Sequence, residues 1–281
     1  WDKSKFATNQ DIVKMFAKHQ PKVLFTTNEK YEYSNTGYAF LGLIIEKVSK
    51  KTFGDFVNDA IFKPLKMQNS LVYRSRFAPQ KIENYALGYV KNEQDDWSLS
   101  DSFGKENMFY YLDGIVGDGM VNSTLDDLLL WDTALYTNQL VDEKDKIEIF
   151  GNPKTNNGDT SNYGFGWVVF NHPTYGKISN HSGSWAGYIT FIERHLDQDK
   201  TIILLQNHTS MFTKNPTAEV RKILNGEPLE SQNLKKVALK EQDLIKYLGV
   251  YATPEFPLKL TVFQEGNVMQ VQATGQSAIP M

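Results

Sequence analysis

Two short segments of the chain carry side chains suited to acid–base and acyl-transfer chemistry. The first is Tyr33-Ser34-Asn35, in which a phenol able to carry a proton stands two residues before an amide able to hold a carbonyl group. The pattern Tyr-x-Asn recurs at Tyr136-Thr137-Asn138, and the composition alone predicts such matches by chance. Tyr33 is the stronger candidate because it directly precedes an amphipathic helix whose packing would fix its ring, whereas Tyr136 lies at a fraying helix end.

The second segment is His181-Ser182-Gly183, at the end of a predicted strand. Histidine titrates near neutral pH, so His181 suits either the binding of a carboxylate when protonated or the relay of a proton when neutral. The small residues that follow would let a substrate backbone lie close to the strand edge, and a side chain at Gly183 would obstruct it.

Each candidate also has a purely structural interpretation. Tyr33 is explained equally by a buried ring bonded to a backbone carbonyl, Asn35 by a helix cap, and His181 by packing. Asp113 and Asp118 lie among glycines, which favours turn-forming aspartates over a catalytic carboxylate pair. The other histidines show no ligand spacing, so we expect surface or hairpin positions for them and no metal or cofactor: His19, His172, His195 and His208.

Helical periodicity predicts the elements that position the first segment. Apolar residues at spacings of three and four indicate a largely buried helix over residues 36–49, capped by Ser34 or Asn35. A second helix should follow Thr52 and end before Pro64. Residues 68–121 have weak periodicity and suggest short strands and loops that wall a cleft. A clear helix spans residues 123–136, with Ser123 and Asp126 as a capping box.

The pattern changes to β from Gly164 onward. The pattern predicts successive strands over residues 166–170, 177–183, 187–196 and 201–207. The short links between them imply an antiparallel sheet. A helix over 217–224 and a hairpin over 258–273 follow. Helices gathered before an antiparallel sheet predict an α+β fold rather than a doubly wound α/β fold.

Composition excludes several classes of protein. The chain has 281 residues, 41% of them hydrophobic, with a formal net charge of -3 and no cysteine. It therefore has no disulfide, no thiolate metal site and no dense positive field for nucleic acid. Its longest apolar run is far shorter than the roughly 20 residues that span a bilayer. Oligomeric state is not readable from the sequence.

Three boxes in order resemble the serine β-lactamase and penicillin-binding-protein superfamily, with class C β-lactamases, carboxylesterases and D-aminopeptidases as the nearest groups. They are Tyr31-Glu32-Tyr33-Ser34-Asn35-Thr36-Gly37-Tyr38, Gly117-Asp118-Gly119-Met120-Val121-Asn122-Ser123-Thr124 and Asn180-His181-Ser182-Gly183-Ser184-Trp185-Ala186-Gly187-Tyr188. The resemblance covers most of residues 1–225. It implies a hydrolase domain over 1–226, a charged connector over 227–246 and the start of a small β domain over 247–281.

The resemblance also implies roles for these residues. Tyr33 would shuttle a proton, and Asn35 would hold a substrate carbonyl or orient a lysine. His181 stands where many lactamases have a lysine, and the backbone N–H of Ser184 would be one oxyanion donor beside Gly183. The expected substrate is a small molecule or peptide, namely a β-lactam, a D-amino-acid peptide or an ester, and the expected location is periplasmic or secreted in a bacterium.

One part of the family pattern is missing. The nucleophile of this superfamily lies in a Ser-x-x-Lys box upstream of Tyr-x-Asn, but the one match here is Ser102-Phe103-Gly104-Lys105, downstream in a polar loop, which we interpret as coincidence. We therefore expect an N-terminally truncated, inactive chain whose serine and lysine lie on another segment. The alternatives are a non-catalytic module that binds peptides or cell-wall fragments, and a purely structural domain.

Overall fold

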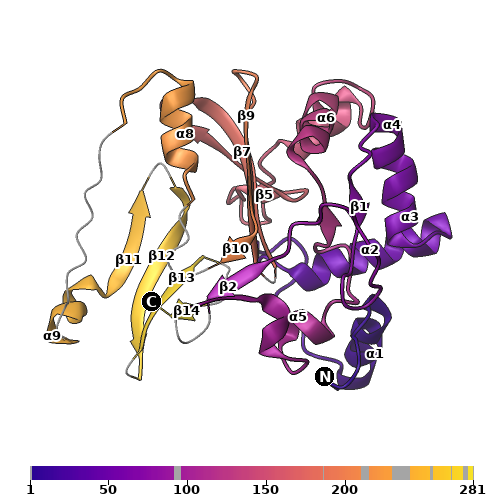
Figure 1. Ribbon diagram of the computed structural model, residues 1–281. Coiled ribbons are helices and arrows are strands. Elements are labelled where there is room, and N and C mark those ends of the chain that lie inside the picture. The colour runs from indigo at the N-terminus through magenta and orange to yellow at the C-terminus, as the bar shows by residue number, and fades with distance from the viewer. Residues whose placement is uncertain are drawn as a thin grey trace.

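The computed structural model describes residues 2–91, 96–185, 187–209, 215–229, 241–253, 256–266, 268–274 and 278–280 (Figure 1). Most of the charged connector expected over 227–246, and Ala186 of the third box, lie outside these described residues.

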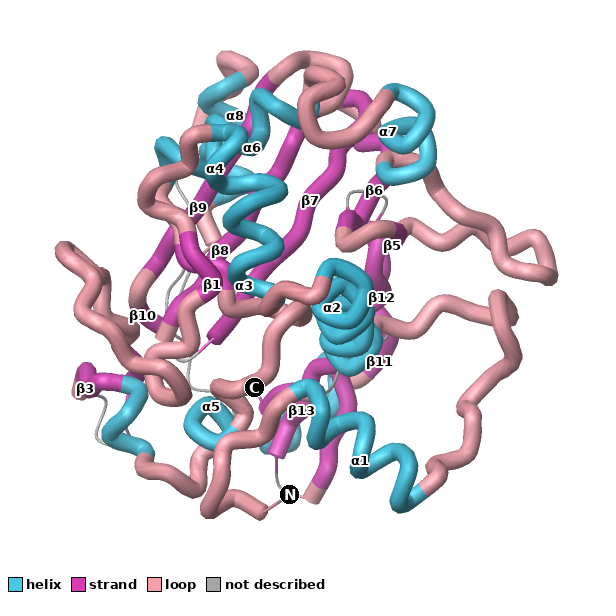
Figure 2. The backbone as a smooth tube through the Cα atoms, turned by 90° about the vertical axis from the view of Figure 1, so that its right-hand side faces the viewer, coloured by secondary structure: helices cyan, strands magenta, loops and turns pink. Residues whose placement is uncertain are grey.

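A five-stranded antiparallel sheet forms the centre of the molecule, in the order β5-β6-β7-β8-β9 (Figures 1 and 2). Its strands are β5 (Tyr163–Gly164), β6 (Trp167–His172), β7 (Gly176–Trp185), β8 (Tyr188–His195) and β9 (Lys200–Gln206). Strands β6 to β9 and the antiparallel sheet type agree with the sequence prediction, which did not include β5, and the α+β class is confirmed. The small sheet β10-β2-β3 contains a parallel pair, between β10 (His208–Thr209) and β2 (Tyr89–Lys91).

Helix α2 (Asn35–Ser49) begins at a side-chain cap: Ser34 Oγ accepts a hydrogen bond from the N–H of Gly37 at 3.0 Å. The prediction of a largely buried helix is wrong. Only Ala39 and Gly42 are buried, and the side chains of Ile44 and Val48 are 56% and 80% exposed. The described neighbours, among them α1 (Asn9–His19) and the helix that follows α2, cover only part of its surface, so most of its apolar stripe contacts solvent.

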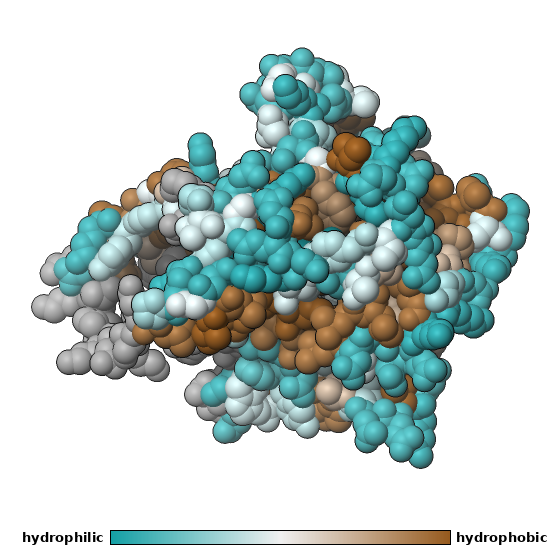
Figure 3. Space-filling view, turned by 90° about the horizontal axis from the view of Figure 1, so that it is seen from above, coloured by the Kyte–Doolittle hydropathy of each residue, from teal (hydrophilic) through white to brown (hydrophobic). Residues whose placement is uncertain are grey.

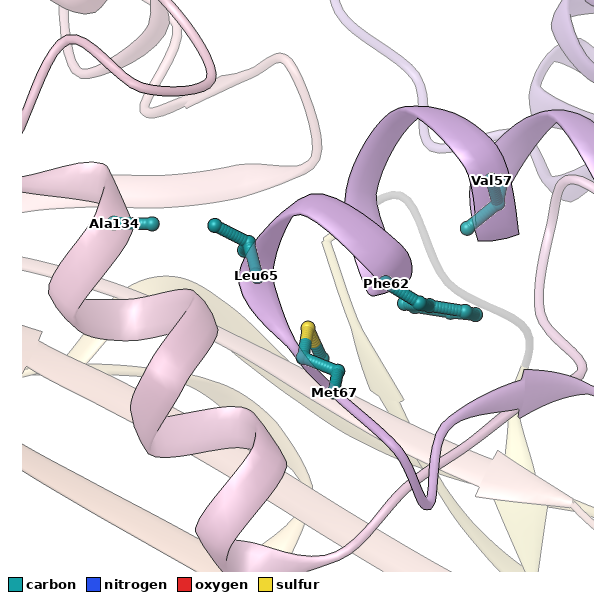
Figure 4. Close-up of a cluster of buried hydrophobic side chains, with 5 residues drawn as sticks. All are labelled: Val57, Phe62, Leu65, Met67 and Ala134. Carbon is teal, nitrogen blue, oxygen red and sulfur yellow. The ribbon is translucent and has the colours of Figure 1, made fainter.

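The helix that follows Thr52 runs through Pro64 instead of ending before it. It consists of α3 (Phe53–Val57), the π-helical turn η1 (Asn58–Phe62) and α4 (Lys63–Leu65). Proline lacks the N–H that an interior helical position donates, and the π turn changes the hydrogen-bond spacing just before Pro64. Leu65 points from α4 toward Ala134 in a buried cluster that also holds Val57, Phe62 and Met67 (Figure 4).

Helix α6 (Leu125–Leu135) connects this cluster to the central sheet. Its cap is Thr124, which accepts from the N–H of Asp127 at 3.3 Å, so the predicted capping box at Ser123 is wrong by one residue. Trp131 of α6 stacks on Trp167 of β6 with ring centroids 5.8 Å apart. This contact fixes the helix against one face of the sheet.

Helix α8 (Thr217–Leu224) packs on β9 and has the bounds that the sequence predicts. A buried charge cluster joins it to the sheet. Glu193 of β8 is fully buried and accepts hydrogen bonds from Arg221 of α8 at 2.7 and 2.6 Å and from His195 at 3.0 Å. Burial acts to raise the pKa of Glu193, but these hydrogen bonds outweigh it and leave that pKa below its ordinary value.

The segment between α4 and α6 consists of short elements and loops, as expected. Besides β2, these elements are β1 (Leu71–Val72), β3 (Trp97–Leu99), η2 (Ser100–Phe103), α5 (Met108–Tyr111) and β4 (Val121–Asn122). The short helix α7 (Glu143–Ile149) follows α6.

A separate four-stranded sheet in the order β11-β12-β13-β14 follows the connector. The predicted hairpin is its central pair, β12 (Phe256–Glu265) with β13 (Val268–Ala273), and β11 (Gly249–Thr253) and β14 (Ile279–Pro280) flank it. Short helices α9 (Glu241–Leu244) and η3 (Ile245–Tyr247) precede it. In Figure 1 this sheet lies on the side of the central sheet away from α6. The boundaries predicted for three domain segments stay a prediction.

The outer surface carries apolar side chains in several places. Seen from above, a band of hydrophobic surface crosses the molecule between hydrophilic regions (Figure 3). In the described part of the chain, no helix is both long enough and apolar enough to cross a membrane.

Candidate active site

Tyr33 directly precedes Ser34, the N-cap of α2. Helix α2 lies beside the central sheet (Figure 1). The side chain of Tyr33 is half-buried. Burial raises the pKa of the Tyr33 phenol above its ordinary value of 10.0, and the neighbouring Tyr38 and the charge of Asp118 raise it further. Tyr33 is therefore a neutral phenol at physiological pH in the environment that these residues provide.

The glycine-rich turn is held against the same helix by a close backbone approach. A Cβ at Gly117 would lie 2.7 Å from the carbonyl oxygen of Tyr38, and Gly117 also has φ +98°, so this position requires glycine. The buried amide of Asn9 donates to the carbonyls of Ala39 and Val116, both at 2.7 Å. Asn9 thus ties α1, α2 and the turn together and holds Asp118 near Tyr33.

His181 lies on β7, close to the hairpin that joins β7 to β8. Strand β6 pairs with β7 only as far as Asn180, whereas β8 pairs with β7 through Trp185. Within the described residues, the stretch 181–185 of β7 therefore has a strand partner on one side alone. An unpaired strand edge of this kind presents backbone N–H and C=O groups to a ligand.

The fold brings Tyr33 and His181 together from distant parts of the sequence. Their ring centroids lie 6.1 Å apart, with the planes tilted by 33°. Tyr163 of β5 contacts both, at centroid distances of 5.6 Å from Tyr33 and 5.7 Å from His181. Tyr31 stacks on Tyr163 at 5.1 Å. We call Tyr31, Tyr33, Tyr163 and His181 the aromatic cluster.

Two hydrogen bonds hold the imidazole of His181. Its Nδ1 lies 2.6 Å from the carbonyl oxygen of Ser182, and its Nε2 lies 3.0 Å from the hydroxyl of Tyr163. Burial lowers the pKa of His181 below its ordinary value of 6.5, and the hydrogen bond to Ser182 only partly opposes this effect. The imidazole is therefore neutral near pH 7.

The other predicted site residues lie on the elements α2 and β7. Asn35 is the first residue of α2 and is exposed, so its amide is open to a ligand, and the cap role belongs to Ser34. Gly183 and Ser184 are on β7, opposite Thr190 and Ile189 of β8. Because side chains alternate along a strand, Gly183 shares a sheet face with His181.

The sequence motif Ser-x-x-Lys does not form a unit. Ser102 donates its hydroxyl to the carbonyl of Leu99, and the ammonium group of Lys105 lies over the ring of Tyr110 at 5.9 Å. Both side chains are therefore engaged with other residues, which agrees with a chance match.

Several sequence interpretations need correction or extension. His172 and His195 lie beside hairpin turns, one of the two expected positions, and both are buried. Asp113 is 1% exposed and accepts hydrogen bonds from the backbone N–H groups of Arg76 and Phe77, so it anchors a distant segment as well as a turn. The sequence reasoning missed Tyr163, although the small glycine-rich segment that follows it signals an unusual strand start. No group of three or more potential metal ligands occurs among the described residues.

Comparisons with solved structures define the class of protein. The chain superimposes on the octameric penicillin-binding protein homologue from Pyrococcus abyssi with a TM-score of 0.65, at 22% identity, over 97% of this chain and 60% of the other. D-amino acid amidase from Ochrobactrum anthropi SV3, complexed with D-phenylalanine, gives a TM-score of 0.60 at 25% identity over 79% and 64%. The fold is that of penicillin-binding proteins.

The family follows from the sequence comparisons. The family model described as Beta-lactamase matches residues 1–224, and penicillin-binding protein 4* of Bacillus subtilis (strain 168) is 38% identical over 278 residues, covering 96% of this chain. The chain belongs to the Beta-lactamase family. It spans 59% of the length of the Bacillus subtilis relative.

Proposed function

We propose that this chain is the larger part of a serine hydrolase of the β-lactamase type, which cleaves an amide, lactam or ester through an acyl-enzyme. The observation that carries the proposal is the contact of Tyr33 with His181, whose ring centroids lie 6.1 Å apart beside a one-sided strand edge. Family membership supports the same reaction class. The B. subtilis relative and the amidase, by their names, bind penicillin and act on D-amino acid amides.

The residues of this chain would supply most of the non-nucleophilic groups. Tyr33 would carry the proton between nucleophile and leaving group, and Asn35 would hold a substrate carbonyl. The backbone N–H of Ser184 would stabilise the developing oxyanion, and Gly183 would leave room for the substrate. His181 would line the site as a neutral imidazole.

The nucleophilic serine and its lysine would come from outside these 281 residues, because the one Ser-x-x-Lys match is engaged elsewhere. A lysine ammonium beside Tyr33 would lower the pKa of the phenol and oppose the effect of burial. By itself, the 281-residue chain would then be inactive. A periplasmic or secreted location is the corresponding proposal for the parent protein, and the domain boundaries at 226 and 246 belong to the same proposal.

Covalent labelling of the parent protein by a serine-directed acylating probe tests this function. The Tyr33→Phe variant should be acylated about 10²–10⁴-fold more slowly, the usual effect of removing a general acid–base group. Tyr136→Phe is the matched control, since Tyr136 begins the other Tyr-x-Asn pattern, and it should be labelled at the wild-type rate. An intact, folded parent that takes no label contradicts the proposal, and so does labelling of the 281-residue chain alone.

A non-catalytic binding module is the second candidate, and the engagement of Ser102, the serine of the one Ser-x-x-Lys match, with Leu99 favours it. Such a module would hold peptides or cell-wall fragments in the same site without acylation. Reversible binding of a peptide by a parent that is never labelled would identify it.

A further inference from the structure

The proposed reaction assigns no role to Tyr163, whose hydroxyl is hydrogen-bonded to His181. The backbone of Tyr163 is fixed on β5, where it pairs with Val168 of β6. The hydroxyl of Ser161 accepts from the N–H of Tyr163 and donates to its carbonyl, both at 3.1 Å. Its ring is fixed as well, between the stacked ring of Tyr31 and the edge contact with Tyr33. A side chain held at so many points presents its hydroxyl in one direction.

The two hydrogen bonds of His181 determine where its proton resides. The carbonyl oxygen of Ser182 can only accept, so the Nδ1 atom, 2.6 Å away, must carry the hydrogen. In a neutral ring the Nε2 atom is then an acceptor, so the hydroxyl of Tyr163, 3.0 Å away, is its donor, and toward Tyr38, its other side-chain hydrogen-bond partner, the Tyr163 oxygen accepts. Both ring nitrogens are thus satisfied by protein groups.

We propose that Tyr163 is a positioning residue that holds His181 as the neutral Nδ1–H tautomer and so keeps this side of the site without a positive charge. This inference rests on the proposed function, and it narrows the substrate class. A neutral imidazole with both nitrogens engaged offers no cation to a carboxylate. The substrate is therefore an amide or ester that is uncharged in the group contacting His181.

The charged and titratable surroundings of His181 agree with this assignment. From the segment before α2 it faces the phenol of Tyr33, and from β5 it faces the phenol of Tyr163. Burial raises the pKa of both phenols, so both are neutral near pH 7. Asp118 in the glycine-rich turn is the nearby acidic group whose charge reaches Tyr33. The rings that contact His181 thus add no charge of their own.

Nitrogen-15 NMR of the 281-residue chain, labelled at its 5 histidines, measures the tautomer directly. The resonances that disappear in His181→Gln identify the ring. At pH 7.5, chosen above the ordinary pKa of histidine, we expect His181 to be mainly the Nδ1–H form. In Tyr163→Phe the ratio of Nδ1–H to Nε2–H should fall several-fold to about tenfold, since one neutral hydrogen bond is lost.

Tyr31→Phe is the matched control, because Tyr31 stacks in the same cluster but its hydroxyl is not the partner of His181. That variant should leave the tautomer ratio unchanged. An Nε2–H tautomer in the unaltered chain overturns the proposal even if Tyr163→Phe does not fold. An unchanged ratio in a folded Tyr163→Phe overturns it as well.

The substrate half of the inference is tested on the parent protein with a pair of acylating probes that differ only by a carboxylate. Faster labelling by the uncharged probe supports the assignment, and His181→Lys should reverse the preference. Faster labelling of the unaltered parent by the carboxylate probe overturns it. The NMR measurement needs no turnover, so a failure of the tautomer assignment is distinct from a failure of the proposed hydrolase function.

Discussion

Gly183→Ala is the most discriminating substitution in the site, because the structure leaves no room for a side chain at this position even without a substrate. An ideal Cβ at Gly183 would lie 2.5 Å from the Oγ1 atom of Thr190, its partner on β8. Side-chain carbons do not approach other atoms within 3.0 Å without movement. Threonine is β-branched and has few alternative rotamers, so it cannot easily turn away.

The magnitude follows from the overlap. Inserting one methyl group into a site without room costs about 1–3 kcal/mol, and we expect Gly183→Ala to lower the free energy of unfolding by that amount. Thr190→Ala removes the obstructing oxygen, while the Thr190 Cβ, 3.9 Å from the ideal Cβ, remains at an ordinary contact distance. In that background the added methyl group should cost less than about 1 kcal/mol, because the two positions are coupled.

Urea denaturation of the four chains, monitored by circular dichroism, measures both costs. If Gly183→Ala is equally destabilising with and without Thr190→Ala, steric conflict with Thr190 is not the reason for glycine here. Acylation of the parent protein then separates structure from function. A stable double variant that is labelled slowly supports the expectation that a side chain at Gly183 obstructs the substrate, whereas labelling at the wild-type rate assigns the glycine to folding alone.

Two further predictions concern buried charge. Arg221→Met should lower the free energy of unfolding by about 3–5 kcal/mol at pH 7, because it leaves the carboxylate of Glu193 buried without the guanidinium group of Arg221. This loss of stability should be smaller at acid pH, where Glu193 binds a proton. Urea denaturation at pH 7 and pH 5 checks this prediction. The folded-state pKa of His181 lies below its ordinary value of 6.5, so the unfolded chain binds the proton first and stability should fall as the pH drops from about 6.5 through that lowered pKa. His181→Gln should flatten this part of the stability profile, and an unchanged slope contradicts the reasoning.

Sequence patterns predicted the elements whose signal is local. Strands β6 to β9 and helix α8 have the expected positions because apolar alternation and nearby turn residues suffice to define them. The cap of α6 was misplaced by one residue because Ser123 and Thr124 are both good caps, and Ser123 instead shares a hydrogen bond with Ser70. The helix continued through Pro64 because a π turn, which no simple spacing rule reveals, precedes it.

Features that depend on distant partners could not be predicted from the sequence. The burial of α2 was overestimated because periodicity identifies an apolar stripe but not what covers it. Tyr163 was missed because its importance comes from a hydrogen bond to His181, which follows only from the pairing of β5, β6 and β7. Tyr33 and His181 were found because each has a local signal, a helix start and a strand end, as well as the family resemblance.

The charges around Tyr33 define what a complete site would need. Burial, Tyr38 and Asp118 all raise the pKa of the Tyr33 phenol, so Tyr33 in these surroundings keeps its proton and is not available as a base. Acceptance of the nucleophile's proton requires a cation close enough to outweigh these effects. The rings that contact Tyr33 in the aromatic cluster provide none, since the imidazole of His181 is neutral near pH 7 and the hydroxyl of Tyr163 is its hydrogen-bond donor. In the proposed reaction, the same neutrality that limits Tyr33 as a base would favour uncharged amides and esters over substrates that place a carboxylate at His181. Proton transfer would then depend on an ammonium group supplied together with the nucleophile.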